Sequence, residues 1–214
     1  MTSQSIEKLW RLARQARIAS RGSASHGPAG LPLLVFMTDR SRVPDPATTI
    51  TALPPGSAVI LRDYDATDRP AMAALMASLC QQRHLMFLVA GDEALARDVK
   101  ADGMHFPEHQ VPRLAPVRHR HPDWWISTAA HSLPALLRAE RNGADMALLS
   151  PAFATDSHKG AKSLGPTRFT ALARQANLPV YALGGIKARS ASRLKGAHTA
   201  GFAAIGALAT SGQD

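Results

Sequence analysis

The stretch DMALLSPAFATDSHKGAKSLGPTRFTALARQANLPVYALGG, residues 145–185, contains one complete copy of the pattern that decides the fold. It begins with an apolar run of strand length at 145–153, passes through a polar loop, and reaches a segment with helical spacing at 166–177. A second apolar run, 179–185, follows and ends in two glycines. Parallel strands are joined by long crossovers that are usually helices, so this order predicts a parallel strand–helix–strand unit.

The same alternation extends over most of the chain. Apolar runs predict eight strands, at 31–39, 57–64, 85–91, 103–107, 123–131, 145–153, 179–185 and 201–209. Helical patterns separate many of them, at 47–53, 69–83, 92–101, 132–143, 166–177 and 187–197. Nearly continuous apolar strands are typical of sheets that are covered on both faces. We therefore expect an α/β fold, a single closed (β/α)₈ TIM barrel.

Two stretches depart from this alternation. The spacing of Ile6, Leu9, Leu12 and Ile18 predicts an extra N-terminal helix, and residues 21–30 read as a flexible link. We thus expect residues 1–30 to form that helix and link, and residues 31–214 to form the barrel. Residues 108–122 are a connection that contains several prolines.

Composition bounds the class of protein. The chain has 214 residues, of which 45% are hydrophobic, which suits one domain with a sizeable core. It has no apolar run long enough to cross a membrane, and its charged N-terminus does not resemble a secretory signal. The single cysteine, Cys80, cannot form an internal disulfide, so we expect a reducing, cytoplasmic setting.

The formal net charge of +9 indicates an anionic partner. Lys and Arg residues are scattered along the chain, and aromatic residues make up only 5%, too few for a platform that stacks nucleic acid bases. We therefore expect a small phosphorylated substrate as partner, and neither nucleic acid nor a membrane. The sequence leaves open whether the chain forms a homo-oligomer.

Two glycine motifs at predicted strand ends suggest a phosphate site. Gly184 and Gly185 end a strand and lead into a helix, where exposed backbone N–H groups and the helix N-terminus favour an anion. A tight turn that needs positive φ is the alternative explanation. Gly206, at the end of the last strand, would leave room for the same anion, or is a simple packing glycine.

Polar side chains at other strand ends are further candidates. Arg62 is either an anion clamp or part of a salt bridge at the rim with Asp63 or Asp65. His131 is either a general acid/base or a histidine that merely begins a helix. We expect His105, inside an apolar run, to be structural. The histidines of RHRHP, 118–122, lack companions at ligand spacing, so the residues predict no metal site.

Seven segments in order resemble the thiamine phosphate synthase and TenI superfamily, over roughly residues 31–209. They are FMTDR (36–40), ILRDY (60–64), ADGMHF (101–106), AAHS (129–132), SPAFATDSHKG (150–160), ALGGI (182–186) and AAIGAL (203–208). This resemblance implies a TIM barrel that acts on the thiazole and pyrimidine phosphates of thiamine biosynthesis. It also implies a substrate or phosphate site, composed of Arg62, Ser132, Thr155, Ser157, Lys159, Gly184, Gly185 and Gly206.

Two departures from the family pattern concern magnesium. In the synthases an INDR motif supplies one Asp for Mg²⁺ and a second Asp follows the HLGQ motif, whereas this chain has Ala90 and Gly91 at the first place and Glu108 near the second. The resemblance then favours a TenI-like role, a thiazole tautomerase in which His131 moves the proton and no cofactor is required.

Three alternatives stay open. The first is a thiamine phosphate synthase that uses Mg²⁺ in a rebuilt site, with Asp92 or Glu108 in place of the missing ligands. The second is a barrel that binds a phosphorylated ligand without catalysis. The third is a protein that binds an anionic polymer.

Overall fold

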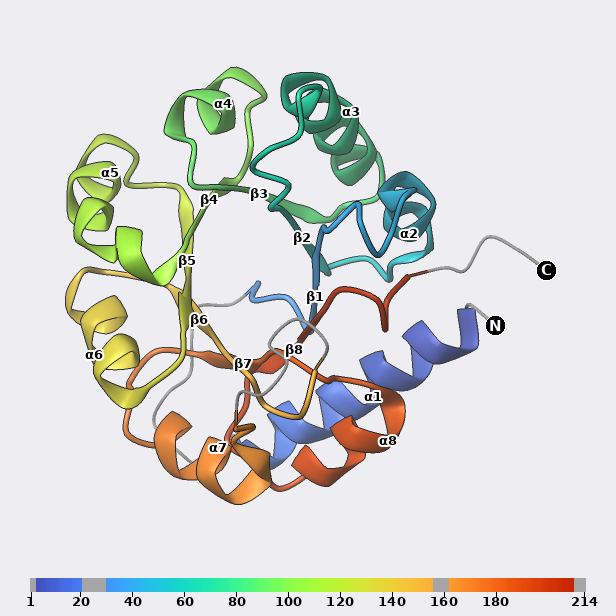
Figure 1. Cartoon of the computed structure of the whole chain (residues 1–214), viewed down its shortest axis with the longest axis vertical. Coiled ribbons are helices and arrows are strands. Elements are labelled where there is room, and N and C mark those ends of the chain that lie inside the picture. Colours follow the sequence, from blue (N-terminus) through green and yellow to red (C-terminus); the bar gives the residue numbers. More distant parts are fainter. Residues whose placement is uncertain (1–2, 21–29, 156–161, 210–214) are drawn as a thin grey trace.

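Eight short parallel strands close into a barrel in the order β1 to β8, and β8 pairs with β1 (Figure 1). The computed structural model describes residues 3–20, 30–155 and 162–209. The strands are β1 (Leu34–Met37), β2 (Ala58–Leu61), β3 (Met86–Ala90), β4 (Gly103–Phe106), β5 (Trp125–Ala130), β6 (Met146–Leu149), β7 (Val180–Ala182) and β8 (Gly201–Ala204). Each lies inside one of the eight apolar runs, so the predicted TIM barrel is confirmed.

Helices surround the strands (Figure 1). They are α1 (Ser3–Ser20), α2 (Pro46–Ala52), α3 (Arg69–Gln82), α4 (Glu93–Asp98), the 3₁₀ helix η1 (Glu108–Arg113), α5 (Leu114–Arg120), α6 (Leu133–Arg141), α7 (Gly165–Ala173), α8 (Ala188–Ala191) and the 3₁₀ helix η3 (Ser192–Leu194). No helix among the described residues is long and apolar enough to cross a membrane.

The Pro-containing connection over 108–122 holds two helices that the sequence did not predict, because η1 and α5 occupy most of it. Pro112 lies within the short 3₁₀ helix, and Pro116 lies in the first turn of α5. The backbone nitrogen of a first-turn residue has no partner within its own helix, so proline is tolerated there.

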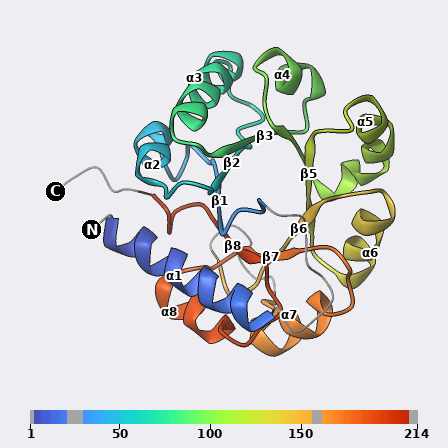
Figure 2. The same ribbon diagram turned by 180° about the vertical axis from the view of Figure 1, so that it is seen from behind.

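The predicted N-terminal helix is present as α1, and it packs on the barrel. The apolar face of α1 is buried (Ile6, Leu9, Leu12, Ala13 and Ala16). Figure 2 shows this helix alongside α8 and β8. Arg17 donates hydrogen bonds to the carbonyl oxygens of Leu31, Pro32 and Ala200, which precede β1 and β8. Helix α1 is therefore anchored at the amino end of the barrel. The link that we predicted at 21–30 lies almost wholly outside the described residues.

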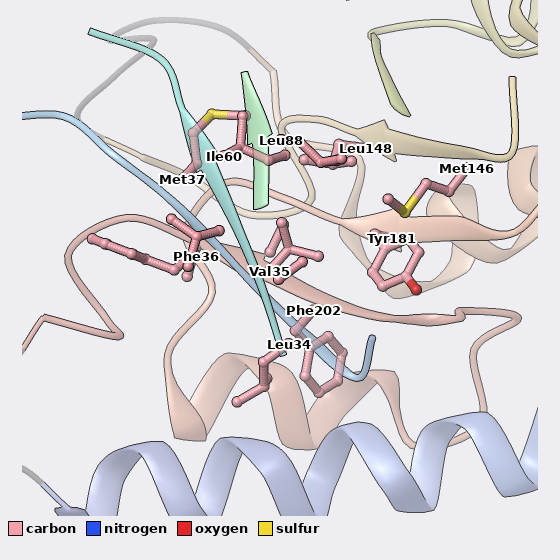
Figure 3. Close-up of a cluster of buried hydrophobic side chains, with 14 of the residues drawn as sticks. Leu34, Val35, Phe36, Met37, Ile60, Leu88, Met146, Leu148, Tyr181 and Phe202 are labelled. Atoms are coloured by element: carbon pink, nitrogen blue, oxygen red, sulfur yellow. The ribbon is translucent and has the colours of Figure 1, made fainter. Parts of the chain in front are cut away.

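The core is built from inward and outward faces of the strands. Figure 3 shows part of it, where Phe202 of β8 lies beside Leu34, its register partner on β1, and Tyr181 lies farther from the flanking helix. These three side chains are almost completely buried. The Tyr181 hydroxyl donates to Pro32 O at 2.7 Å, so the polar atom of this core residue is satisfied at the amino end of the barrel. The opposite, carboxyl end carries the polar strand termini.

Candidate functional site

A cavity of about 350 Å³ opens at the carboxyl ends of the strands. It is lined by residues that follow or end β1, β2, β6, β7 and β8 (Met37, Arg42, Arg62, Ser150, Thr155, Leu183, Gly184, Gly185, Ile186, Lys187, Ala204, Ile205, Gly206 and Ala207). Active sites of TIM barrels lie at this end. The structure thus brings together five of the predicted site residues, Arg62, Thr155, Gly184, Gly185 and Gly206, in one hollow.

The two glycines after β7 adopt a turn that other residues would not tolerate. Gly184 has φ +90° and Gly185 has φ +64°, and a Cβ on Gly185 would clash with Ala154 O and lie 2.8 Å from Phe153 Cβ. Within the described chain, neither glycine donates its N–H to another residue. The two explanations of the glycine pair, a tight turn and a phosphate site, are therefore compatible. The turn needs glycine for its conformation, and it leaves two backbone donors available to an anion.

Ser190 fixes the chain that follows this turn. Its hydroxyl donates to Gly185 O at 2.7 Å and accepts the N–H of Lys187 at 2.9 Å. Lys187 lines the cavity directly after the glycine turn. A lysine ammonium beside free backbone N–H groups favours a phosphate.

Arg62 takes part in an ion cluster at the opposite wall. Its guanidinium donates to Asp39 Oδ2 at 2.5 Å, and Arg42 Nε lies 3.4 Å from the same oxygen. Burial would raise the pKa of Asp39, but the Ser41 hydroxyl and the two guanidinium groups together hold it below its usual value. Asp39 is therefore ionised, and the two arginines leave a net positive wall facing the cavity.

His131 and Ser132 do not line this cavity. The carboxylate of Glu108 accepts hydrogen bonds from His131 N at 2.9 Å and lies 2.7 Å from His131 Nδ1, while Arg138 binds its other oxygen at 3.2 Å. Ser132 Oγ accepts the N–H of Ala135 and caps α6. The role of His131 as an acid/base and that of Ser132 as a substrate ligand stay predictions.

The loop after β6 is described only in part. Thr155 lines the cavity, whereas Ser157 and Lys159 lie outside the described residues, so their part in an anion site stays a prediction. The cavity also contains three polar residues that we did not predict: Arg42, Ser150 and Lys187. Lys187 follows the glycine pair directly, which is a signal that the sequence did contain.

His105 is structural in its surroundings, as expected. It is 2% exposed, and its Nδ1 lies 2.8 Å from the Ser127 hydroxyl on the neighbouring strand β5. Burial, and then the charge of Arg62, lowers its pKa from 6.5 to about 3. The imidazole is therefore neutral at physiological pH.

The carboxyl end of β3 does not offer the donors that Mg²⁺ prefers. Ala90 and Gly91 have no side-chain oxygen, and Asp92 caps α4 through Leu95 N while its other oxygen lies 3.4 Å from Arg69 Nη1. Glu108 is bound by His131 and Arg138. Among residues 3–20, 30–155 and 162–209, no three His, Cys, Asp or Glu side chains are grouped to hold a metal ion. As the described residues are arranged, neither Asp92 nor Glu108 belongs to such a group.

Comparison with known proteins places this geometry in a family. A family model described as thiamine monophosphate synthase matches residues 34–208. The putative thiamine-phosphate synthase 2 of Aquifex aeolicus is 34% identical over 161 residues, which cover 73% of this chain and 86% of that protein. The thiamine-phosphate synthase of Chlorobium luteolum is 32% identical over 182 residues, which cover 83% of this chain and 85% of that protein.

A solved structure agrees with the fold. Thiamine phosphate pyrophosphorylase from Pyrococcus furiosus superposes with a TM-score of 0.71 at 24% identity, over 82% of this chain and 86% of that one. The family model extends from β1 to the turn after β8, so it includes every strand of the barrel and the whole described lining of the cavity. This chain therefore belongs to the thiamine monophosphate synthase family.

Proposed function

We propose that this chain is an enzyme of thiamine biosynthesis that binds a thiazole phosphate in the cavity at the carboxyl end of the barrel. The phosphate lies on the backbone N–H groups of Gly184 and Gly185, near Gly206 and Lys187. The observation that carries this proposal is the glycine turn, because its two N–H groups have no partner in the described chain and both glycines line the cavity. The expected cytoplasmic location is also part of the proposal, and the oligomeric state stays open.

The first candidate reaction is that of the synthases, after which the relatives are named. A pyrimidine pyrophosphate and the thiazole phosphate are joined: the thiazole nitrogen forms a bond to the carbon that carries the pyrophosphate, the bond from that carbon to the pyrophosphate oxygen breaks, and pyrophosphate leaves with the electron pair. The cavity has anion-binding groups for two anionic reactants, since the glycine turn and Lys187 line it together with Arg62 and Arg42. Fixed cations stabilise the charge that develops on a departing pyrophosphate.

The second candidate is a proton transfer on the thiazole, the reaction expected of a TenI-like protein. The contact between His131 Nδ1 and the Glu108 carboxylate, at 2.7 Å, favours it, because a carboxylate bound to one ring nitrogen fixes the orientation of the imidazole. The lack of a magnesium donor set at β3 also favours it, because a proton transfer expels no pyrophosphate.

An assay with both thiamine precursors separates the two candidates. Formation of thiamine phosphate supports the synthase reaction, whereas tautomerisation of the thiazole carboxylate phosphate that is lost in His131→Gln supports the proton transfer. If neither reaction occurs but thiazole phosphate binds, the chain is a binding protein without catalysis.

The phosphate site itself is tested with one pair of variants. A Cβ on Gly206, which lines the cavity, or on Gly196, which does not, meets no atom within 4 Å. We expect Gly206→Val to weaken the binding of thiazole phosphate by about tenfold, or about 1.4 kcal/mol. The matched control, Gly196→Val, should bind as the natural chain does; equal affinities in calorimetry would show that the ligand does not lie beside Gly206.

A further inference from the structure

The formal charges of the chain are unevenly distributed between two parts of the barrel. Residues 3–20 and 162–209, which include α1, α7, α8 and η3, contain eleven Lys and Arg residues and one acidic residue, Glu7. Residues 30–155 contain twelve Lys and Arg residues and thirteen acidic residues. The cations are spread along the sequence, whereas the acidic residues are almost confined to its middle part. The excess positive charge of the described chain therefore lies on its first helix and its last quarter.

The fold brings several of these cations to the amino end of the barrel. Helices α1, α7 and α8 lie on the same side of the molecule (Figure 1, Figure 2). A helix that connects two parallel strands runs back to the amino end, so Arg174 and Lys195, which follow α7 and η3, come to the end at which α1 is anchored. Lys8, Arg11 and Arg14 lie on the exposed face of α1. We call these five exposed residues the basic face.

Carboxylates do little to neutralise the basic face. Of the eleven ion pairs between described residues, ten lie within residues 30–155, and the other joins Arg11 Nε to Glu7 Oε1 at 2.9 Å. Both of these side chains are exposed, and an exposed pair contributes little to stability. Residues 162–209 contain no Asp or Glu. Like charges held on one face repel one another, and a bound polyanion would relieve that repulsion.

The other side chains on this side favour a polymer of phosphates over a protein or a membrane. The core of a protein interface is rich in large apolar side chains, whereas Ile18 is the only large apolar residue that is exposed within 3–20 and 162–209. An amphipathic helix binds a membrane by inserting its apolar face, but the apolar face of α1 is already buried against the barrel. Arginine and lysine without apolar neighbours suit a phosphate backbone.

The aromatic residue of α1 favours a duplex over a single strand. Proteins that bind single strands stack the bases on exposed aromatic rings. Trp10 is partly buried and packs on the core, and the guanidinium carbon of Arg14 lies 5.9 Å from the centre of its ring. This ring is therefore not a platform for bases, and the cations remain as the groups that contact the ligand.

We propose that the basic face binds the phosphate backbone of double-stranded nucleic acid, independently of base sequence. The proposal selects the anionic polymer that the sequence left open as an alternative, and it takes the place of the expectation that excluded nucleic acid. That expectation depended on the scattered positions of the cations and not on the absence of acidic residues near them. The proposal goes beyond the proposed function and does not rest on it, since no residue of the basic face lines the cavity.

Fluorescence anisotropy with a labelled DNA duplex of about 20 base pairs tests the proposal on the full chain at increasing salt. The logarithm of the affinity should fall linearly with the logarithm of the salt concentration, with a slope of about −0.9 for each phosphate contacted. The combined variant Lys8→Gln, Arg11→Gln and Arg14→Gln should bind about tenfold or more weakly at low salt. Its slope should be smaller by about 2.7, the value for three lost contacts. Duplexes of unrelated sequence should bind equally well.

The matched control removes the same charge from another part of the barrel. Arg83, Arg97 and Arg113 are exposed and belong to the end of α3, to α4 and to η1. Figure 1 shows α3 and α4 across the barrel from α7 and α8. The combined variant Arg83→Gln, Arg97→Gln and Arg113→Gln should keep its affinity for the duplex within about threefold. Equal losses in the two variants would overturn the proposal, because the affinity would then depend on net charge alone.

Two other probes identify a different partner. If poly-L-glutamate binds as tightly as the duplex, the basic face fits an acidic protein instead. If vesicles of phosphatidylglycerol bind and the duplex does not, it fits a membrane surface, and either result overturns the proposal. Both variants should bind thiazole phosphate as the natural chain does, so failure here is distinguishable from failure of the proposed function.

Discussion

His105 gives the molecule a pH dependence that can be predicted from one residue. In the unfolded chain its imidazole binds a proton near pH 6.5, whereas burial in the barrel lowers the pKa to about 3. Between these values the unfolded state binds more protons than the folded state. The free energy of unfolding is therefore highest above pH 6.5 and falls as the pH decreases toward 3, by up to about 1.4 kcal/mol per pH unit from this group.

Chemical unfolding measured across this pH range checks that slope. His105→Gln keeps a hydrogen-bonding side chain beside Ser127 but cannot take up the proton. We expect the variant to be less stable at neutral pH, yet to lose stability less steeply as the solution is acidified. Parallel curves for the two proteins would contradict the assignment of this titration to His105.

The glycine turn gives a second prediction at the scale of the residue, for stability rather than binding. Gly185→Ala places a methyl group against Ala154 O and Phe153 Cβ at a backbone φ of +64°, and we expect a loss of about 2 kcal/mol or more. Gly206→Ala meets no atom within 4 Å and should change stability by less than about 0.5 kcal/mol. Urea unfolding compares them; similar midpoints would mean that the segment after β6 does not pack on the turn.

At the scale of the element, helix α1 is part of the barrel through Arg17. The Nε and Nη1 atoms of this side chain bind Ala200 O at 2.6 Å and Leu31 O at 2.8 Å, at the amino ends of β8 and β1. We expect Arg17→Met to lower the free energy of unfolding by about 2–4 kcal/mol, because the part-buried carbonyl oxygens of Leu31 and Ala200 lose the hydrogen bonds of this side chain. Lys8→Met, an exposed change on the same helix, should cost less than about 0.5 kcal/mol.

Secondary-structure elements were largely predictable, for a physical reason. A strand that is buried on both faces must be apolar throughout, so each strand of the barrel was visible as a run of apolar residues. The runs were longer than the strands because hydrogen-bonded pairing stops where the strands diverge: the run at 57–64 contains β2 only as far as Leu61. Segment 108–122 was missed because proline suggests a loop, although it is tolerated in a first turn.

The anchoring of α1 could not be predicted. Its apolar spacing predicted a helix with one buried face, but the partners of Arg17 lie as far as 183 residues away in the chain. Nothing in the local sequence distinguishes this arginine from its exposed neighbours Arg11 and Arg14.

At the scale of the whole molecule, the rule that TIM barrels place their active sites at the carboxyl ends of the strands predicted more of the site than any single motif did. It selected strand ends, and five predicted residues from four different connections do line one cavity. It did not separate Arg42 or Ser150 from other loop residues, since their place depends on how the loops fold back. The surroundings of Gly91, directly after β3, were equally hidden: only the structure shows that the Tyr64 ring lies beside this glycine and that Arg69 lies over the ring.

The cavity spans the seam at which the barrel closes, and this leads to a last prediction. Its walls come from the ends of β7 and β8 on one side and from β1 and β2 on the other, and β8 pairs with β1. A ligand that contacts both walls binds only the closed barrel, so it stabilises the whole fold rather than one loop. At a concentration of 100 times Kd, thiazole phosphate should raise the free energy of unfolding by about 2.7 kcal/mol.

Thermal unfolding with increasing ligand measures this effect, and the same thiazole without its phosphate is the control. The phosphorylated compound should raise Tm progressively, and added salt should reduce the rise because ions screen its charge from Lys187, Arg42 and Arg62. The unphosphorylated compound should leave Tm almost unchanged, since it lacks the group that the glycine turn binds. An equal rise with both compounds would place the affinity in the apolar part of the cavity and remove the phosphate from its role as the anchor of the ligand.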